Sequence, residues 1–256
     1  MKHDVILVAK IFARAQAVME EHFHVHKLYE ASDRKAFLAK LAPTCRALAT
    51  FGGAGADASL MDALPKLGLI SHFGVGYDSV DVTAAHQRKI IVTNTPDVLN
   101  DCVADTAMGL TLNVLRKFPQ SENYLRSGFW ISRGGYPLTV SLHGKTMGII
   151  GLGRIGEAIA QRAQAHGMQI AYHNRRKKNV PYAYYADPVS LARAADVLMV
   201  VTPGGAETKH LINNQVLDAL GAQGFLVNIS RGSVIDEEAL VHSVLCGGIA
   251  GACLDV

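Results

Sequence analysis

The sequence has little charge, no paired cysteines and no long apolar run. Only 18% of its 256 residues are charged and the formal net charge is +3, which is too small to indicate a nucleic-acid or membrane surface as a partner. The four cysteines have no C-x-x-C spacing, so neither a disulfide framework nor a zinc site is predicted. The run Val5–Ala9 is too short for a signal peptide, and no run of about 18 apolar residues occurs. A cytoplasmic protein is expected.

Short β-rich runs alternate with helical patterns along the whole chain. This alternation is typical of α/β proteins with parallel sheets. The length favours two domains, and we place them at residues 1–97, a flavodoxin-like substrate lobe, and 98–256, a doubly wound dinucleotide-binding lobe. The apolar spacing from Leu99 to Phe118 predicts a connecting helix that Pro119 interrupts, followed by a loop rich in glycine and aromatic residues.

The expected strands follow from β-rich segments bounded by turn residues. In the first lobe they are Val5–Ala9, Phe23–Leu28, Arg46–Thr50, Leu67–Phe73 and Ile90–Thr93; in the second, Thr146–Ile150, Gln169–His173, Tyr182–Ala186, Val197–Val201, Phe225–Ile229 and Ile249–Leu254. Helices are expected at Ser32–Leu41, Ser59–Leu64, Val82–Arg88 and Arg154–His166, and helix N-caps at Asp187, at Asn213 or Asn214, and at Asp236.

A G-x-G-x-x-G motif follows the first strand of the second lobe and opens a helix. It reads Gly151-Leu152-Gly153-Arg154-Ile155-Gly156. In this context the first glycine permits a tight turn, the second lets a pyrophosphate approach the backbone, and the third lets the helix pack on the strand. The first-turn N–H groups and the helix dipole would hold the phosphates. A plain glycine-rich turn is the alternative.

The residue that reads the adenosine ribose is expected at the end of the next strand, roughly 20 residues beyond the first glycine. The sequence there is Asn174-Arg175-Arg176, where an NAD-preferring site would have Asp or Glu. Guanidinium groups bind a 2′-phosphate in a bidentate manner, whereas a carboxylate repels it. The pattern therefore favours NADPH over NADH. A solvated basic run from Arg175 to Lys178 is the alternative.

Several further motifs, taken together, are specific. They are the segments 73–81 (FGVGYDSVD), 103–105 (VAD), 142–156 (LHGKTMGIIGLGRIG), 227–232 (VNISRG) and 251–256 (GACLDV). The whole chain resembles the D-2-hydroxyacid dehydrogenase family, and in particular its NADPH-dependent glyoxylate/hydroxypyruvate reductases and their hydroxyphenylpyruvate reductase relatives.

The resemblance implies roles for individual residues. Arg231 would bind the carboxylate and keto oxygen of a 2-keto acid, where negative charge develops as hydride arrives. Backbone N–H groups of Val75, Gly76 and the Gly52-Gly53 loop would hold the carboxylate. Thr202, Pro203 and Thr208 would flank the cofactor, Ile229 and Asp255 would lie near its nicotinamide end, and Trp130 would contact a neighbouring subunit's substrate pocket or pack locally. The resemblance also implies a homodimer.

Family members continue a few dozen residues beyond the Leu-Asp-Val at which this sequence ends. That segment carries the Glu and the proton-donating His of the family and a last helix of the first lobe. The resemblance therefore implies that the C-terminal part of the family fold is missing and that the 256 residues bind cofactor with little turnover. His72 is expected to be a core or second-layer histidine. His22, His24 and His26 are expected to alternate along an exposed edge strand rather than to bind metal.

Three functions remain open at this point. The leading one is an enzyme that reduces glyoxylate, hydroxypyruvate or a related 2-keto acid with NADPH. The second is a nucleotide-sensing, co-repressor-like binding protein of the same fold, or a fragment with weak catalysis. The third is an enzyme of the same superfamily with another substrate, such as phosphoglycerate, formate or phosphonate.

Overall fold

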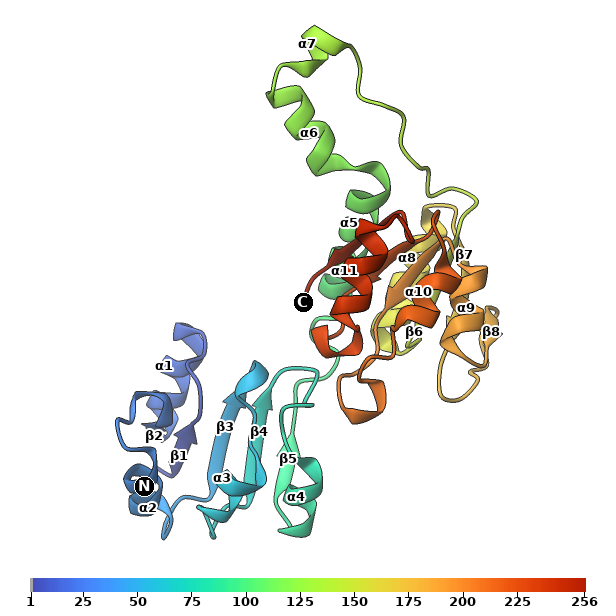
Figure 1. The fold of residues 1–256 in the computed structure, drawn as a ribbon. Helices are drawn as coiled ribbons and strands as arrows, with labels where there is room; N and C mark the ends of the chain where they lie inside the picture. Colours follow the sequence, from blue (N-terminus) through green and yellow to red (C-terminus); the bar gives the residue numbers. More distant parts are fainter. Residues whose placement is uncertain (1) are drawn as a thin grey trace. The chain divides into compact units, whose positions relative to one another are not determined.

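The computed structural model describes residues 2–256, which form two compact units that divide between Val98 and Leu99. The α/β class expected from the sequence is confirmed, since each unit contains one parallel sheet with helices packed on it (Figure 1). No helix among the described residues is long and apolar enough to cross a membrane.

The first unit has a five-stranded parallel sheet in the order β2-β1-β3-β4-β5. This is the flavodoxin-like order. Its core is a single apolar cluster on one face of the sheet, where Ile6, Leu48 and Ile70 pack against helices α2, α3 and α4. The elements are β1 (Asp4–Leu7), α1 (Ala13–His22), β2 (His24–Lys27), α2 (Arg34–Leu41), β3 (Ala47–Phe51), α3 (Ala58–Asp62), β4 (Leu69–Phe73), α4 (Val82–Gln87) and β5 (Ile91–Thr93).

The second unit has a six-stranded parallel sheet in the order β11-β10-β9-β6-β7-β8, the doubly wound order of dinucleotide-binding folds. Helices α5 and α8 pack on one face, and α9, α10 and α11 on the other. The elements are α5 (Asn100–Arg116), β6 (Thr146–Ile150), α8 (Arg154–Ala165), β7 (Gln169–His173), β8 (Ala183–Tyr185), α9 (Pro188–Ala194), β9 (Val197–Val200), α10 (Asn214–Leu220), β10 (Phe225–Asn228), α11 (Glu237–Leu245) and β11 (Gly251–Leu254).

Side-chain caps fix the start of several helices. Asp187 accepts from the backbone N–H of Ser190, and Asp236 accepts from that of Ala239, as the sequence predicts. Of the two asparagines proposed for α10, Asn213 is the cap.

The segment after the connecting helix differs from the prediction. Pro119 does not end the helix: α5 ends at Arg116, Lys117 adopts a left-handed conformation (φ 51°), and α6 (Phe118–Arg126) begins with Pro119 in its first turn. Proline is tolerated there because first-turn N–H groups have no helical acceptor. The predicted loop contains α6 and a second short helix, α7 (Phe129–Arg133). Neither helix buries a residue, and Figure 1 shows both beyond the end of α5, away from the sheet.

The prediction that three histidines alternate along an edge strand of the first sheet was partly wrong. His22 ends α1 and is not on the strand. His24 and His26 lie on β2, which is indeed the edge strand, and His26 Nε2 donates to Asp4 Oδ1 at 2.7 Å. This hydrogen bond lowers the pKa of the Asp4 carboxyl. His72 is 1% exposed on β4, as expected of a core histidine.

Candidate functional site

The G-x-G-x-x-G turn is tight on its inner side and open on its outer side. A Cβ on Gly151, whose φ is +100°, would lie 2.9 Å from the backbone of Val201, so only glycine fits. A Cβ on Gly156 would lie 2.6 Å from the carbonyl oxygen of Gly151. At Gly153 nothing lies within 4 Å of such a Cβ. The space in front of Gly153 is therefore where a pyrophosphate can approach the backbone.

Two further features of this turn fit a phosphate-containing ligand. Helix α8 has no side chain capping its start, so its first-turn N–H groups face the turn with the positive end of the helix dipole. Thr202 Oγ1, beyond the end of β9, is buried and has no hydrogen-bond partner among residues 2–256. A buried hydroxyl without a partner is unfavourable unless a ligand or water satisfies it. The residues present thus fit a dinucleotide cofactor.

Asn174 holds the glycine turn from the neighbouring strand. Its Oδ1 accepts from the backbone N–H of Leu152 at 2.7 Å, and its Nδ2 donates to the carbonyl of Leu152 at 3.2 Å. Asn174 was expected to contact the ribose, but both polar atoms of its side-chain amide form hydrogen bonds to the glycine turn. Sequence spacing correctly placed Asn174 at the end of β7, but gave no sign of this pairing.

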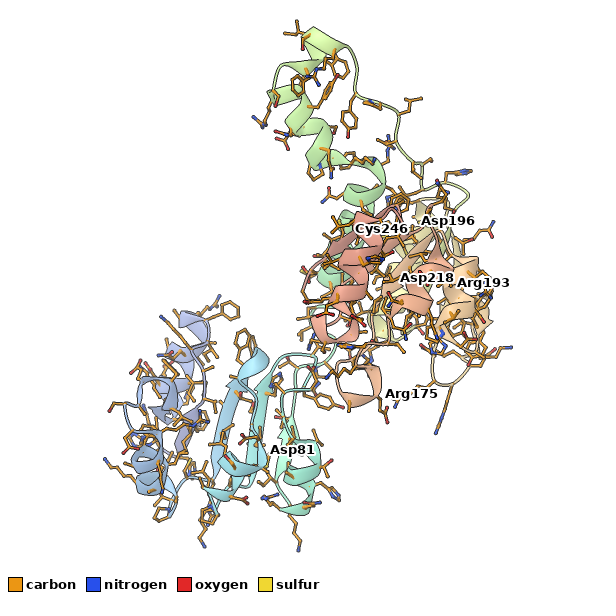
Figure 2. The ribbon with its side chains drawn as sticks, viewed as in Figure 1. Asp81, Arg175, Arg193, Asp196, Asp218 and Cys246 are labelled. Carbon is orange, nitrogen blue, oxygen red and sulfur yellow. The ribbon has the colours of Figure 1, made fainter. Side chains whose placement is uncertain are left out.

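The basic run after β7 divides into residues with different contacts. Arg175 Nη1 donates to Glu207 Oε2 at 2.9 Å, and Figure 2 labels Arg175 beside the loop that follows β9. Lys178 pairs with Glu157 and also donates to the carbonyl of Leu152 at 3.2 Å. Arg176 is exposed and makes no ion pair with any described residue. The run is thus more than a uniformly solvated surface, because two of its members are already engaged near the glycine turn.

Arg231 follows β10 in a turn that Asn228 fixes. Asn228 is fully buried; its Oδ1 accepts from the backbone N–H of Ser230 at 2.9 Å and its Nδ2 donates to the carbonyl of Arg231 at 3.0 Å. Arg231 Nη1 donates to the carbonyl of Ser230 at 2.7 Å, so the half-buried guanidinium is held close to the turn. The N-x-S-R-G motif therefore acts as a locked turn that presents an arginine at the end of a buried strand.

The remaining predicted cofactor residues lie on adjacent loops. Thr208 Oγ1 donates to the carbonyl of Pro203 at 2.8 Å, which closes the turn after β9. Ile229 is buried directly after β10, and the backbone N–H of Asp255 donates to the carbonyl of Asn228 at 2.9 Å. The parallel sheet brings the predicted cofactor residues and Arg231 to one edge, at the carboxyl ends of β6, β7, β9, β10 and β11: Gly151, Leu152, Gly153, Arg154, Ile155, Gly156, Asn174, Arg175, Arg176, Thr202, Pro203, Thr208, Ile229, Arg231 and Asp255.

The first unit presents a separate set of backbone groups at the carboxyl ends of β3 and β4. Gly52 and Gly53 follow β3, and a Cβ on either would meet nothing within 4 Å. Val75 and Gly76 follow β4, and Asn94 Nδ2 donates to the carbonyl of Val75 at 2.9 Å. The four positions expected to hold a carboxylate thus lie on two adjacent loops.

The sequence analysis missed a cluster of three aromatic rings beside these loops. Phe12, Phe51 and Phe73 lie with ring centroids 5.8 to 6.0 Å apart. Phe51 and Phe73 are the last residues of β3 and β4 and pair directly in register. Phe12 and Phe73 are 64% and 44% exposed. An aromatic residue at the end of two successive strands was the available signal, since parallel strands end at the same edge.

Comparison with known proteins identifies the family of this chain. Residues 108–256 match the model of the D-isomer specific 2-hydroxyacid dehydrogenase, NAD binding domain. The chain is 44% identical to a hydroxyphenylpyruvate reductase of Plectranthus scutellarioides and 41% identical to a glyoxylate/hydroxypyruvate reductase of Arabidopsis thaliana, in each case over 98% of this chain and 80% of the relative.

A solved structure is similarly close. It is that of the NADPH-dependent glyoxylate/hydroxypyruvate reductase of Sinorhizobium meliloti in complex with NADP and malonate, with 45% identity and a TM-score of 0.92, over 100% of this chain and 80% of that one. With the matched domain, the identities and the glycine turn in agreement, the chain belongs to the D-isomer specific 2-hydroxyacid dehydrogenase family.

Proposed function

We propose that the protein reduces a small 2-keto acid, such as glyoxylate or hydroxypyruvate, to the 2-hydroxy acid and that it prefers NADPH to NADH. The observation that carries this proposal is the open turn at Gly153 with Arg175 and Arg176 at the end of the adjacent strand. The relatives named above are all reductases, and one is NADPH-dependent. The co-repressor-like alternative is therefore not favoured.

The chain's own residues supply binding and charge stabilisation. The bound cofactor provides the hydride. Arg231 would bind the substrate's carboxylate and keto oxygen, and its permanent positive charge would stabilise the negative charge that develops on that oxygen. Backbone N–H groups of Val75 and Gly76, with those of Gly52 and Gly53, would hold the carboxylate. At Gly52 and Gly53 the absence of a side chain leaves the backbone accessible.

NADPH preference would come from the two arginines. The 2′-phosphate carries roughly 1.5 to 2 negative charges at neutral pH, by analogy with other phosphate monoesters, and guanidinium groups bind such a group in a bidentate manner. We expect the double variant Arg175→Gln/Arg176→Gln to raise KM for NADPH by about tenfold or more, which corresponds to ~1.4 kcal/mol, and KM for NADH by less than about threefold. Steady-state oxidation of both coenzymes with glyoxylate measures this. Equal increases for the two coenzymes would refute the assignment.

We also propose a homodimer that uses α6 and α7. These helices bury no residue within the chain, and Ile131 and Leu138 are almost completely exposed at 92% and 103%. Such a concentration of exposed apolar side chains marks an interaction surface. Trp130, 55% exposed on α7, would contribute to the same surface.

Light scattering tests the dimer. Ile131→Asp/Leu138→Asp should halve the molar mass, whereas Leu245→Asp, at an 80% exposed position on α11, should leave it unchanged. A wild-type protein with the mass of one chain would contradict the proposal.

We also propose a cytoplasmic location, because none of the cysteines forms a disulfide. Cys45, Cys102, Cys246 and Cys253 are all free thiols, which fits a reducing compartment. Fractionation of the source cells with an antibody to the protein tests this, and recovery from an oxidising compartment would contradict it.

A further inference from the structure

One of the two arginines proposed to bind the 2′-phosphate already forms an ion pair with a carboxylate of this chain. Arg175 Nη1 lies 2.9 Å from Glu207 Oε2. Arg175 follows β7, and Glu207 lies in a 3₁₀ turn, Ala206–Thr208, that follows β9. In the sheet β6 lies between β7 and β9. The ion pair therefore joins the two loops that flank the Gly151–Gly156 turn, on the side where the adenosine ribose is expected.

We propose that Glu207 sets coenzyme selectivity by competing with the 2′-phosphate for Arg175. This inference rests on the proposed NADPH preference. A ligand with a 2′-phosphate must displace the Glu207 carboxylate from Arg175 and then lies close to a second negative charge. A ligand with a free 2′-hydroxyl meets neither cost. Glu207 thus reduces a preference for NADPH that Arg175 and Arg176 create.

The contacts around Glu207 support this role. Thr208 Oγ1 donates to the carbonyls of Pro203 and Gly205, so the turn that carries Glu207 is held in place. Both partners of the ion pair are well exposed, Arg175 at 87% and Glu207 at 80%. An exposed pair of this kind is weak, at about 0–1 kcal/mol, so a phosphate can replace the carboxylate.

The other basic residues of the run do not share this contact. Lys178 is engaged with Glu157 and the Leu152 carbonyl, on the turn itself. Arg176 has no ion pair with any residue from 2 to 256 and is therefore the uncontested guanidinium. Glu207 accordingly modulates one of two phosphate contacts and does not block the site.

Calorimetry of ligand binding tests the proposal without turnover. The ligands are NADP⁺ and NAD⁺, with adenosine 2′,5′-bisphosphate and 5′-AMP as fragments that lack the nicotinamide. We expect Glu207→Gln to lower the Kd for NADP⁺ and for the bisphosphate by about three- to fivefold, the upper range for an exposed pair. The Kd for NAD⁺ and 5′-AMP should change by less than about twofold, and the gain should shrink at high salt. Asp62→Asn, which removes an exposed carboxylate paired with Arg88 in the first unit, is the matched control and should change nothing.

A double-substitution comparison identifies the route of the effect. In an Arg175→Gln background the competition is absent, so Glu207→Gln should give a clearly smaller gain than in the wild type. An equal gain in both backgrounds would overturn the proposal, since Glu207 would then act through general charge. Weaker NAD⁺ binding in Glu207→Gln with unchanged NADP⁺ binding would also overturn it and assign Glu207 to the ribose hydroxyls. Equal wild-type affinities for NADP⁺ and NAD⁺ would instead refute the NADPH preference, a separate failure.

Discussion

The two sheets of this protein differ in how completely they are buried. In the second unit β6, β9 and β10 are buried along almost their whole length, because helices cover both faces. In the first unit β4 alternates: Ile70 and His72 are buried, while Leu69 and Phe73 are exposed. That face of the first sheet is thus open at β4, although it is covered at β1, where Val5 and Leu7 are buried.

The difference shows which unit is the more complete scaffold. Parallel sheets are normally covered on both faces, as the second sheet is. Its two apolar layers fix the strand ends from which the glycine turn and the Arg231 turn project. The first unit has one apolar cluster on one face of its sheet, and on the other face the buried apolar residues are Val5 and Leu7 of β1, so its outer strands depend on fewer contacts for stability. We therefore expect the second unit to have the higher local stability and the first to respond more weakly to changes on its open face.

The largest expected effect is on stability. Leu198→Ala removes a fully buried leucine of β9 and should cost about 2–5 kcal/mol, whereas Leu69→Ala, at a 37% exposed position on β4, should cost under ~1 kcal/mol. Leu48→Ala, on the buried face of β3, should resemble Leu198→Ala and serves as the control. Amide hydrogen exchange of peptides from each sheet measures the losses separately, since two units need not unfold in one step. A cost for Leu69→Ala equal to that for Leu198→Ala would break the comparison.

The next effect contrasts the glycine turns of the two units. Gly151→Ala forces a Cβ against the Val201 backbone at φ +100° and should lower dinucleotide affinity by about tenfold or more, ~1.4 kcal/mol. In Gly52→Ala the new Cβ has no atom within 4 Å. The free energy of unfolding should therefore fall by only about 1 kcal/mol, the strain of a left-handed conformation in a residue other than glycine.

Gly153→Ala separates binding from folding in this experiment. Its φ is −93° and its Cβ would have open space, so the thermal midpoint should not change while NADP⁺ binding weakens. Calorimetry and thermal unfolding on the same preparations provide both measurements. Unchanged binding in Gly153→Ala would show that the pyrophosphate does not approach this turn.

The sequence predicted most of the second unit because local signals there agree with the tertiary structure. The strands Thr146–Ile150 and Gln169–His173 have the predicted bounds, since each is an apolar run bounded by glycine or by polar residues. The helices α6 and α7 were missed. Neither buries a residue, and the glycines and Pro119 of this segment favoured a loop.

Contacts between distant loops could not be predicted in the same way. The Asn174 amide on Leu152 and the Arg175–Glu207 pair join segments 22 and 32 residues apart. Each depends on which strands are neighbours and where they end. The motif spacing placed Asn174 and Arg175 at the correct edge, but only the strand order brings Glu207 to that edge.

The smallest expected effect is on the pH dependence of stability. It concerns one carboxylate at the amino-terminal end of a strand in each sheet, Asp196 before β9 and Asp4 at the start of β1. At Asp196 burial acts to raise the pKa, but the Lys145 ammonium and the Thr146 N–H, each 2.8 Å away, outweigh it and hold the pKa below its ordinary value of 3.8. A lowered folded pKa means that the carboxylate stabilises the fold above pH 3.8 and that this contribution is lost as the pH falls through the folded value. Asp196→Asn should therefore cost about 1 kcal/mol or less at pH 7, and this cost should vanish in acid.

Asp4 is the counterpart in the first sheet. The hydrogen bond from His26 lowers its pKa, so its contribution also disappears in acid. His26 lies on the edge strand β2, where salt can screen the pair, whereas Asp196 also accepts a hydrogen bond from a backbone N–H. Asp4→Asn should therefore lower the thermal midpoint at pH 7 by less than Asp196→Asn does, and adding salt should reduce its effect further. Thermal unfolding of both variants from pH 3 to pH 7 measures the two profiles. A larger loss for Asp4→Asn than for Asp196→Asn would mean that this edge of the first sheet contributes more to stability than the Lys145–Asp196 pair does, and the ranking of the two units would be reversed.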